Sequence, residues 1–130
     1  MTVSTHVLDT RTGRPAAGVP VILERETERE TPDFEGTWSR VEPEQADTEQ
    51  TDTERTNAER TDADGRLRIS GKMPPGVYRI TFRTGDYFAA QGVETFYPRV
   101  VVVFEVTSAT EHYHVPLLLS PFAYSTYRGS

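Results

Sequence analysis

The three histidines of the chain are the residues whose type and spacing first suggest chemistry. His112 and His114 flank Tyr113, and His6 lies near the N-terminus. In a strand, alternate residues point to one face, so His112 and His114 would share a face. Imidazole has an unperturbed pKa of about 6.5 and can act as a general acid or base. Two alternatives stay open: hydrogen-bonded structural histidines, or a zinc site built from His-x-His and the distant histidine.

Arg66 stands out among the arginines because of the turn before it. It follows Asp62-Ala63-Asp64-Gly65, which would present the arginine at the start of a strand. The ordinary alternative is a solvated turn arginine. Arg55 and Arg60 end similar short units and are expected to be decoys for this motif.

The elements that must position these residues are mostly strands, because the hydrophobic pattern has a period of two. In the first segment one face would carry Val3, Thr5 and Val7, and the other would carry Ser4, His6 and Leu8. The further expected strands are 19–23, 38–41, 66–69, 76–82, 99–106 and 111–119. The last two are expected to form a hairpin through residues 107–110.

Two strands have faces that can be assigned from alternation. We expect Tyr78, Ile80 and Phe82 to point inward. In the last strand, Tyr113, Val115, Leu117 and Leu119 would take one face, and His112, His114, Pro116 and Leu118 the other. One short helix is expected, capped by Thr84 and ended by Gly92. Seven to eight strands with one helix predict an all-β, two-sheet sandwich.

Length and composition favour one domain covering residues 1–130. The chain has 130 residues, 35% of them hydrophobic, and no apolar run long enough to span a bilayer. No basic-then-apolar signal begins the sequence, so a cytoplasmic location is expected. The absence of cysteine excludes disulfides and thiolate metal sites.

The acidity of the chain is local. The net charge is −6, yet residues 24–64 hold 15 of the 20 acids and 5 of the 14 bases. The remainder is mildly basic, which suits a small anionic ligand better than nucleic acid. Within the acidic part, residues 42–60 contain near-repeats and almost no apolar side chain. They are expected to form a flexible loop insertion, with a cation site or docking segment as the alternative.

Several segments together closely resemble one known family over nearly the whole chain. They are STHVLDT from Ser4, GRPA from Gly13, TDADGR from Thr61, HYHVPLLLSP from His112 and YSTYRGS from Tyr124. The chain resembles the transthyretin-like 5-hydroxyisourate hydrolases. The terminal Tyr-Arg-Gly-Ser separates these hydrolases from the transthyretin carriers that share their fold. The acidic insertion is the one clear departure, and it leaves the motifs intact.

The resemblance implies a transthyretin-like homotetramer with active sites at the subunit interface. It implies hydrolysis of 5-hydroxyisourate in urate degradation, with no cofactor and no metal. The implied catalytic residues are His6, Arg66, His114 and Ser130, and the implied substrate-binding residues are Tyr127, Arg128 and Gly129. His112 would be a neighbour of the site. A C-terminal segment that forms the wall of an active site would explain why aromatic chemistry continues to the last residue.

Opening a cyclic amide with water requires three functions. These are a base for the water, a stabiliser for the developing oxyanion and a proton for the leaving nitrogen. We expect His6, His114 or both to activate the water, and Arg66 to hold the acyl oxygen. Arg128 would bind substrate or hold the C-terminus, and Ser130 would orient substrate or relay a proton. The rival interpretations are a transthyretin-like ligand carrier without catalysis, a zinc protein and a cell-surface sandwich module.

Overall fold

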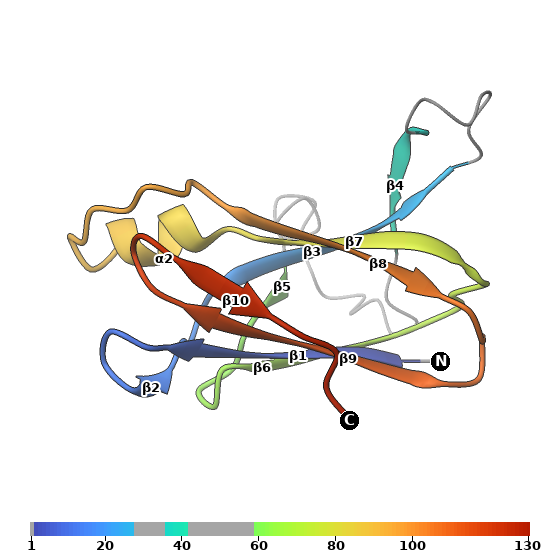
Figure 1. The fold of residues 1–130 in the computed structure, drawn as a ribbon, viewed down its shortest axis with the longest axis horizontal. Coiled ribbons are helices and arrows are strands. Elements are labelled where there is room, and N and C mark those ends of the chain that lie inside the picture. Colours follow the sequence, from blue (N-terminus) through green and yellow to red (C-terminus); the bar gives the residue numbers. More distant parts are fainter. Residues whose placement is uncertain (1, 28–35, 42–58) are drawn as a thin grey trace, which may run out of the picture.

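The computed structural model describes residues 2–27, 36–41 and 59–130. Within these residues the chain forms two sheets and one short helix (Figure 1). The elements are β1 (Thr2–Asp9), β2 (Arg14–Pro15), β3 (Pro20–Glu26), β4 (Trp38–Arg40), β5 (Glu59–Arg60), β6 (Arg66–Ser70), β7 (Gly76–Phe82), α2 (Thr84–Ala89), β8 (Val100–Val106), β9 (His112–Leu119) and β10 (Tyr124–Thr126). The predicted two-sheet β-sandwich with one helix is confirmed. The described strands also include very short ones, such as β2 and β5, that the alternation does not reveal.

β1 is the central strand of the first sheet. The order is β10-β9-β1-β2, and β6 also pairs with β1. β9 runs parallel to β1, with His114 opposite Ser4, and β6 runs antiparallel, with Arg66 opposite His6. The second sheet has the order β4-β3-β7-β8, with β5 paired to β3.

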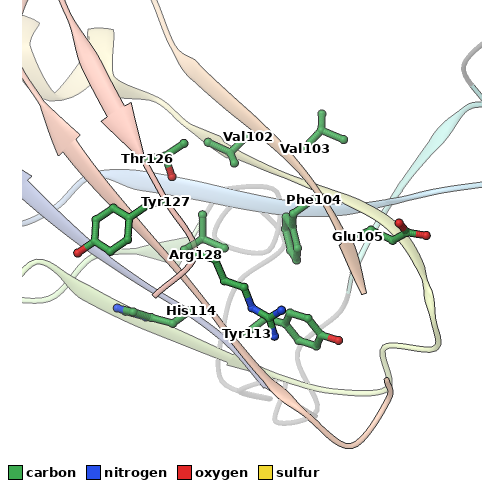
Figure 2. A pocket seen from close by; sticks show the side chains of 10 residues that line it. Val102, Val103, Phe104, Glu105, Tyr113, His114, Thr126, Tyr127 and Arg128 are labelled. Atoms are coloured by element: carbon green, nitrogen blue, oxygen red, sulfur yellow. The ribbon is translucent and has the colours of Figure 1, made fainter. Parts of the chain in front are cut away.

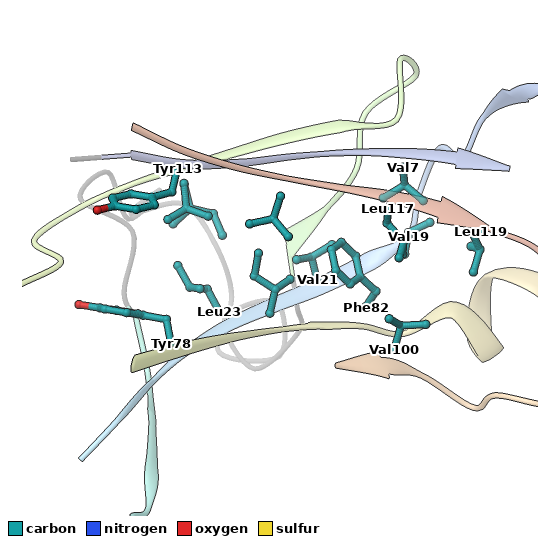
Figure 3. Packing of buried hydrophobic residues seen from close by; sticks show 14 of the residues in the cluster. Val7, Val19, Val21, Leu23, Tyr78, Phe82, Val100, Tyr113, Leu117 and Leu119 are labelled. Atoms are coloured by element: carbon teal, nitrogen blue, oxygen red, sulfur yellow. The ribbon is translucent and has the colours of Figure 1, made fainter. Parts of the chain in front are cut away.

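The hydrophobic core lies between the two sheets (Figure 3). Val7 and Leu117 from the first sheet are fully buried, as are Tyr78 and Phe82 from the second. The burial pattern confirms the faces predicted for β1, β7 and β9, except that Pro116, expected on the outer face of β9, is buried. Fully burying each large apolar side chain contributes about 1.5–3 kcal/mol, so this packing fixes which residues of β1 and β9 point outward.

The hairpin predicted through residues 107–110 is wrong. Among the described strands, β8 pairs with β7 in the second sheet, whereas β9 pairs with β1 and β10 in the first. The connection therefore crosses from one sheet to the other. The Tyr113 hydroxyl accepts hydrogen bonds from the backbone N–H groups of Thr107 and Ser108, at 3.0 and 3.1 Å, and ties the connection to the core. A link this short fits either arrangement, so its length could not decide between them.

The helix also differs in detail from the prediction. Thr84 is its first residue and not its cap: Arg83 holds that position, and no side chain donates or accepts a capping bond. The Thr84 hydroxyl is buried without a hydrogen-bond partner among the described residues. The helix ends at Ala89, and Gly92 follows in the left-handed region with φ +69°.

The predicted acidic insertion falls largely outside the described residues. Residues 42–58 lie outside the described residues, whereas Glu59 and Arg60 form β5, which pairs with β3. In the part of the chain that is described, no helix has the length and apolar character needed to cross a membrane.

Candidate functional site

His6, Arg66 and His114 lie on three neighbouring strands of the first sheet. β1 carries His6, β6 places Arg66 directly opposite it, and β9 carries His114 on the other side of β1. Because Val7 and Val115 are buried in the core, the alternating neighbours turn away from it. The sheet thus brings together on its outer face three residues that are distant in sequence.

The turn before Arg66 is fastened to β1. Asp62 Oδ1 accepts hydrogen bonds from the backbone N–H groups of Asp64 and Arg66, both at 2.9 Å. The Gly65 carbonyl accepts one from Val7 N–H at 2.8 Å. Gly65 has φ +74°, and a Cβ there would lie 2.5 Å from the Val7 carbonyl oxygen. The turn therefore needs glycine, and it fixes Arg66 beside the strand that carries His6.

A pocket of about 510 Å³ opens on this face. Its lining residues are Ser4, Thr5, Arg60, Asp62, Arg66, Leu67, Arg68, His112, His114 and Ser130. Three guanidinium groups line one cavity, which favours an anionic ligand. Four of the predicted catalytic residues thus lie on or next to this face: Arg66, His114 and Ser130 line the pocket, and His6 pairs with Arg66 beside it.

Arg60, which the sequence analysis sets aside as a decoy for the Arg66 motif, lies at the same pocket as Arg66. It lines the pocket, and its guanidinium donates a hydrogen bond to the Gly18 carbonyl at 3.1 Å. Arg55 lies outside the described residues. Both end similar sequence units, so the repeat itself gave no signal to separate them; only the pairing of β5 with β3 does.

Ser4 connects the two histidines of β9. Its hydroxyl lies 2.7 Å from His114 Nδ1 and 2.9 Å from His112 Nε2. Thr2 Oγ1 contacts Nδ1 of His112 on the far side. The sequence reasoning did not single out Ser4. The signal was nevertheless present, since alternation already placed Ser4 on the same face of β1 as His6.

The surroundings of His114 favour the neutral form of its imidazole. Burial lowers the pKa of His114, and nearby His112 lowers it further. A hydrogen bond with the Ser4 backbone raises the pKa, while His6 and Arg66 lower it. The net direction is below the usual value of about 6.5. A neutral imidazole beside a guanidinium can accept a proton while the cation holds an oxyanion.

The C-terminal segment lies across the ring of His114. The Gly129 N–H donates a hydrogen bond to the His114 carbonyl at 2.9 Å. A Cβ on Gly129 would collide with the imidazole, at 3.1 Å from Cγ and closer still to Cδ2, and would lie 3.2 Å from Pro116 Cγ. Only glycine lets the backbone pass this close, which brings Ser130 to the pocket.

Tyr127 and Arg128 line a second pocket, of about 320 Å³, between β8 and the C-terminal segment (Figure 2). The Arg128 guanidinium lies 5.0 Å from the centre of the Tyr113 ring, and its Nη2 lies 3.5 Å from Glu111 Oε2. His114 lines both pockets. Within one chain, then, these two predicted substrate-binding residues are not in the pocket of Arg66.

The described residues offer no ligand set for the zinc site that was the alternative interpretation of the histidines. No group of three or more histidine, cysteine, aspartate or glutamate side chains is arranged there to hold a metal ion. The two histidines of β9 instead face the Ser4 hydroxyl.

Comparison with known proteins shows which family the chain belongs to. The model of the HIUase/Transthyretin family matches residues 3–129. The chain belongs to this family. It is 39% identical to a 5-hydroxyisourate hydrolase of Salmonella typhimurium, over 98% of this chain and 80% of that protein. It is 41% identical to a 5-hydroxyisourate hydrolase of Mus musculus, over 98% of this chain and 94% of that protein.

Solved structures of this family have the same fold. The 5-hydroxyisourate hydrolase of Klebsiella pneumoniae is 34% identical with a TM-score of 0.68, over 99% of this chain and 93% of that chain. A transthyretin from Sparus aurata is 30% identical with a TM-score of 0.74, over 98% of this chain and 95% of that chain. The backbone thus resembles both kinds of family member, and the side chains of the site must distinguish between them.

Proposed function

We propose that this chain is a hydrolase that converts 5-hydroxyisourate to 2-oxo-4-hydroxy-4-carboxy-5-ureidoimidazoline in urate degradation. The observation that carries the proposal is the convergence of Arg66, His114 and Ser130 on one pocket. A ligand carrier needs shape and apolar contacts, whereas a hydrolase needs a base and a stabiliser of negative charge. The relatives named as 5-hydroxyisourate hydrolases support the same substrate.

The reaction in this proposal is attack of water on a cyclic amide. His114 is the base for the water, because its lowered pKa leaves the ring neutral at pH 7. Arg66 holds the acyl oxygen and the charge that develops there, and His6 orients the water or supplies a proton. Ser130 positions the substrate at the end of the pocket.

The three residues before Ser130 support the site in different ways. Gly129 carries the chain over the ring of His114. Arg128 is anchored by Glu111 and Tyr113, which favours its role in holding the C-terminal segment. Tyr127 is 58% exposed, and in our proposal it reaches substrate only in the assembled protein.

A homotetramer with sites at subunit interfaces is part of the proposal. β8 and β10 end the strand orders of their sheets, and both contribute to the second pocket or its border. Val103 on β8 and Tyr124 on β10 are 56% and 42% exposed. Edge strands with exposed apolar side chains invite pairing with another chain.

We expect the enzyme to act in the cytoplasm, which cell fractionation would test.

A ligand carrier is the alternative function, and the backbone likeness to a transthyretin is the observation that favours it. Ultraviolet spectroscopy of 5-hydroxyisourate, generated in place by urate oxidase, separates the two. We would compare the native chain with one lacking Tyr127–Ser130. Faster decay with the native chain alone supports the hydrolase and the role of the C-terminus. No acceleration by either chain supports the carrier, and equal acceleration contradicts the role given to the C-terminus.

A further inference from the structure

Four side chains on the outer face of the first sheet form a continuous hydrogen-bonding series. Thr2 contacts His112, His112 Nε2 lies 2.9 Å from the Ser4 hydroxyl, and that hydroxyl lies 2.7 Å from His114 Nδ1. The two strands run parallel with Thr2 opposite His112 and Ser4 opposite His114, so backbone register maintains the series. His112 is exposed, whereas His114 is half-buried.

Resting on the proposed function, we propose that His112 and Ser4 form a proton relay that connects His114 to solvent. Ser4 and His112 are positioning residues in this account, and His114 alone meets the water. A serine hydroxyl has one proton to donate and two lone pairs to accept with. Ser4 can therefore donate to one histidine only while it accepts from the other.

The relay alternates between a base form and an acid form of His114, and in each step every proton that enters is matched by one that leaves. In the base form, His114 Nδ1–H donates to Ser4 Oγ and the Ser4 hydroxyl donates to His112 Nε2, which leaves His114 Nε2 with a free lone pair. When Nε2 takes a proton from water, the Nδ1 proton passes to Ser4 and the Ser4 proton passes to His112. His112 then passes its Nδ1 proton to the Thr2 hydroxyl, which gives its own proton to solvent. His114 is now neutral with its proton on Nε2.

The same steps in reverse restore the base form. His114 gives its Nε2 proton to the leaving nitrogen and takes the Ser4 proton at Nδ1. Ser4 takes the proton of His112 Nε2, and His112 takes one at Nδ1 from the Thr2 hydroxyl, which takes one from solvent. One imidazole thus serves first as base and then as acid, and no charge stays on the half-buried ring. The series therefore gives His114 both proton-transfer roles.

The charges around the series favour fast discharge of protons. His6 and Arg66 face His114 from β1 and β6, and Arg60 and Arg68 line the same pocket. These groups disfavour an imidazolium on His114. Asp62 also lines the pocket, but its Oδ1 is occupied by backbone N–H groups. Asp62 is the one acidic side chain among the residues that line this pocket.

The first experiment compares Ser4→Ala with Ser4→Thr. The alanine removes the relay oxygen and the threonine keeps a hydroxyl. Ser39→Ala, at the exposed residue of β4, controls for loss of a serine elsewhere. General acid–base catalysis contributes roughly 10²–10⁴-fold, so we expect kcat of Ser4→Ala to fall by about 10- to 100-fold with little change in KM. Threonine and the Ser39 control should stay near the native rate.

A dependence on small buffer bases distinguishes a relay from a merely structural role. For Ser4→Ala, kcat should rise with the concentration of added imidazole at fixed pH, because an external carrier replaces the missing path. The native rate should not depend on the buffer. A native-like kcat for Ser4→Ala, or a lowered rate that does not respond to imidazole, would overturn the relay while leaving the proposed hydrolase in place.

Nitrogen NMR of the imidazoles tests the relay without measuring activity. Replacing Ser4 with alanine should change the populations of Nδ1–H and Nε2–H forms of His114, and Ser4→Thr and Ser39→Ala should not. The same populations in all four proteins would overturn the relay. A native chain that does not accelerate 5-hydroxyisourate decay would instead refute the hydrolase, and with it any part for the relay in that reaction.

Discussion

Gly129 and His114 are in direct contact: the backbone of the penultimate residue passes over the imidazole of the proposed base and hydrogen-bonds to its carbonyl. The contact fixes the ring from above, while Ser4 meets its Nδ1 from the neighbouring strand. The C-terminal segment is thus a structural wall of the site in the single chain.

Replacing Gly129 with alanine should damage catalysis more than folding. The added Cβ would collide with the His114 ring and displace either the ring or the C-terminal segment. Small misplacements near reacting groups cost roughly 10²-fold in rate, so we expect a kcat loss of about that size. Ser125→Ala in exposed β10 is the control. Native kcat in Gly129→Ala would show that the contact does not position the base.

The pH profile of kcat/KM should report the lowered pKa of His114. The neutral ring is the active form, so activity should be retained as pH falls past about 6.5 and be lost only below it. Because His112 lowers this pKa, His112→Gln should move the acid limb to higher pH, whatever its effect on the maximal kcat/KM. An acid limb above 6.5 in the native protein would contradict the base assigned to His114.

Gly65→Ala and Gly13→Ala form a matched pair. Both glycines have positive φ, +74° and +73°, but only Gly65 has a close neighbour, the Val7 carbonyl oxygen. Strained backbone positions cost roughly 1–3 kcal/mol, which both variants should lose in the free energy of unfolding. Gly65→Ala should lose more and should also raise KM, because the turn positions Arg66. Equal effects of the two substitutions in denaturant melts and kinetics would refute the role of the close approach.

Deleting residues 42–58 should leave the turnover number nearly unchanged. The segment is rich in acids, has few apolar residues and precedes the turn that presents Arg66. The deletion keeps Glu59 and Arg60, since β5 pairs with β3 and Arg60 lines the pocket. A short Gly-Ser linker would join Val41 to Glu59. A collapse of activity in the folded deletion variant would show that the segment shapes the site.

Val103→Glu should dissociate the proposed tetramer. Val103 is 56% exposed on β8, which ends the strand order of the second sheet. Side chains opposite each other on paired strands have Cβ atoms about 4.5–5.5 Å apart, so a carboxylate there would lie close to the side chains of any chain that pairs with β8. Ser39→Glu on β4, at the opposite end of that sheet, is the charge-matched control. Light scattering after size exclusion should give a smaller mass for Val103→Glu alone; equal masses would place the interface elsewhere.

Much of the fold follows from local alternation, and the rest depends on long-range pairing. The burial of β1, β7 and β9 follows from their period of two, except at Pro116, which is buried next to Gly129. The link at residues 107–110 carries the signals of a turn, yet whether β8 pairs with β9 depends on competition from β7 and β1, which local sequence does not encode. Thr84 has a capping side chain, but packing buries its hydroxyl instead.

The sequence predicts the candidate-site residues that lie in recognisable motifs. It does not predict the contacts that depend on which strands pair and in which register. The histidines stand out by residue type and Arg66 by the turn before it, and the resemblance selects His6, Arg66 and His114, which lie on neighbouring strands. Ser4 begins the STHVLDT segment, but its contact with both histidines of β9 appears only when β9 is placed parallel to β1. Arg60 resembles the repeat units before it and is distinguished only by the pairing of β5.

The most direct test of the account compares the native protein, His114→Ala and His112→Ala for acceleration of 5-hydroxyisourate decay. We expect the native chain to be fast and His114→Ala, folded and assembled as the native protein, to lose nearly all activity. His112→Ala should retain part of its activity, because it loses the relay but keeps the base. A fully active His114→Ala protein would contradict the central claim that this imidazole, held by Ser4 and Gly129, activates the water.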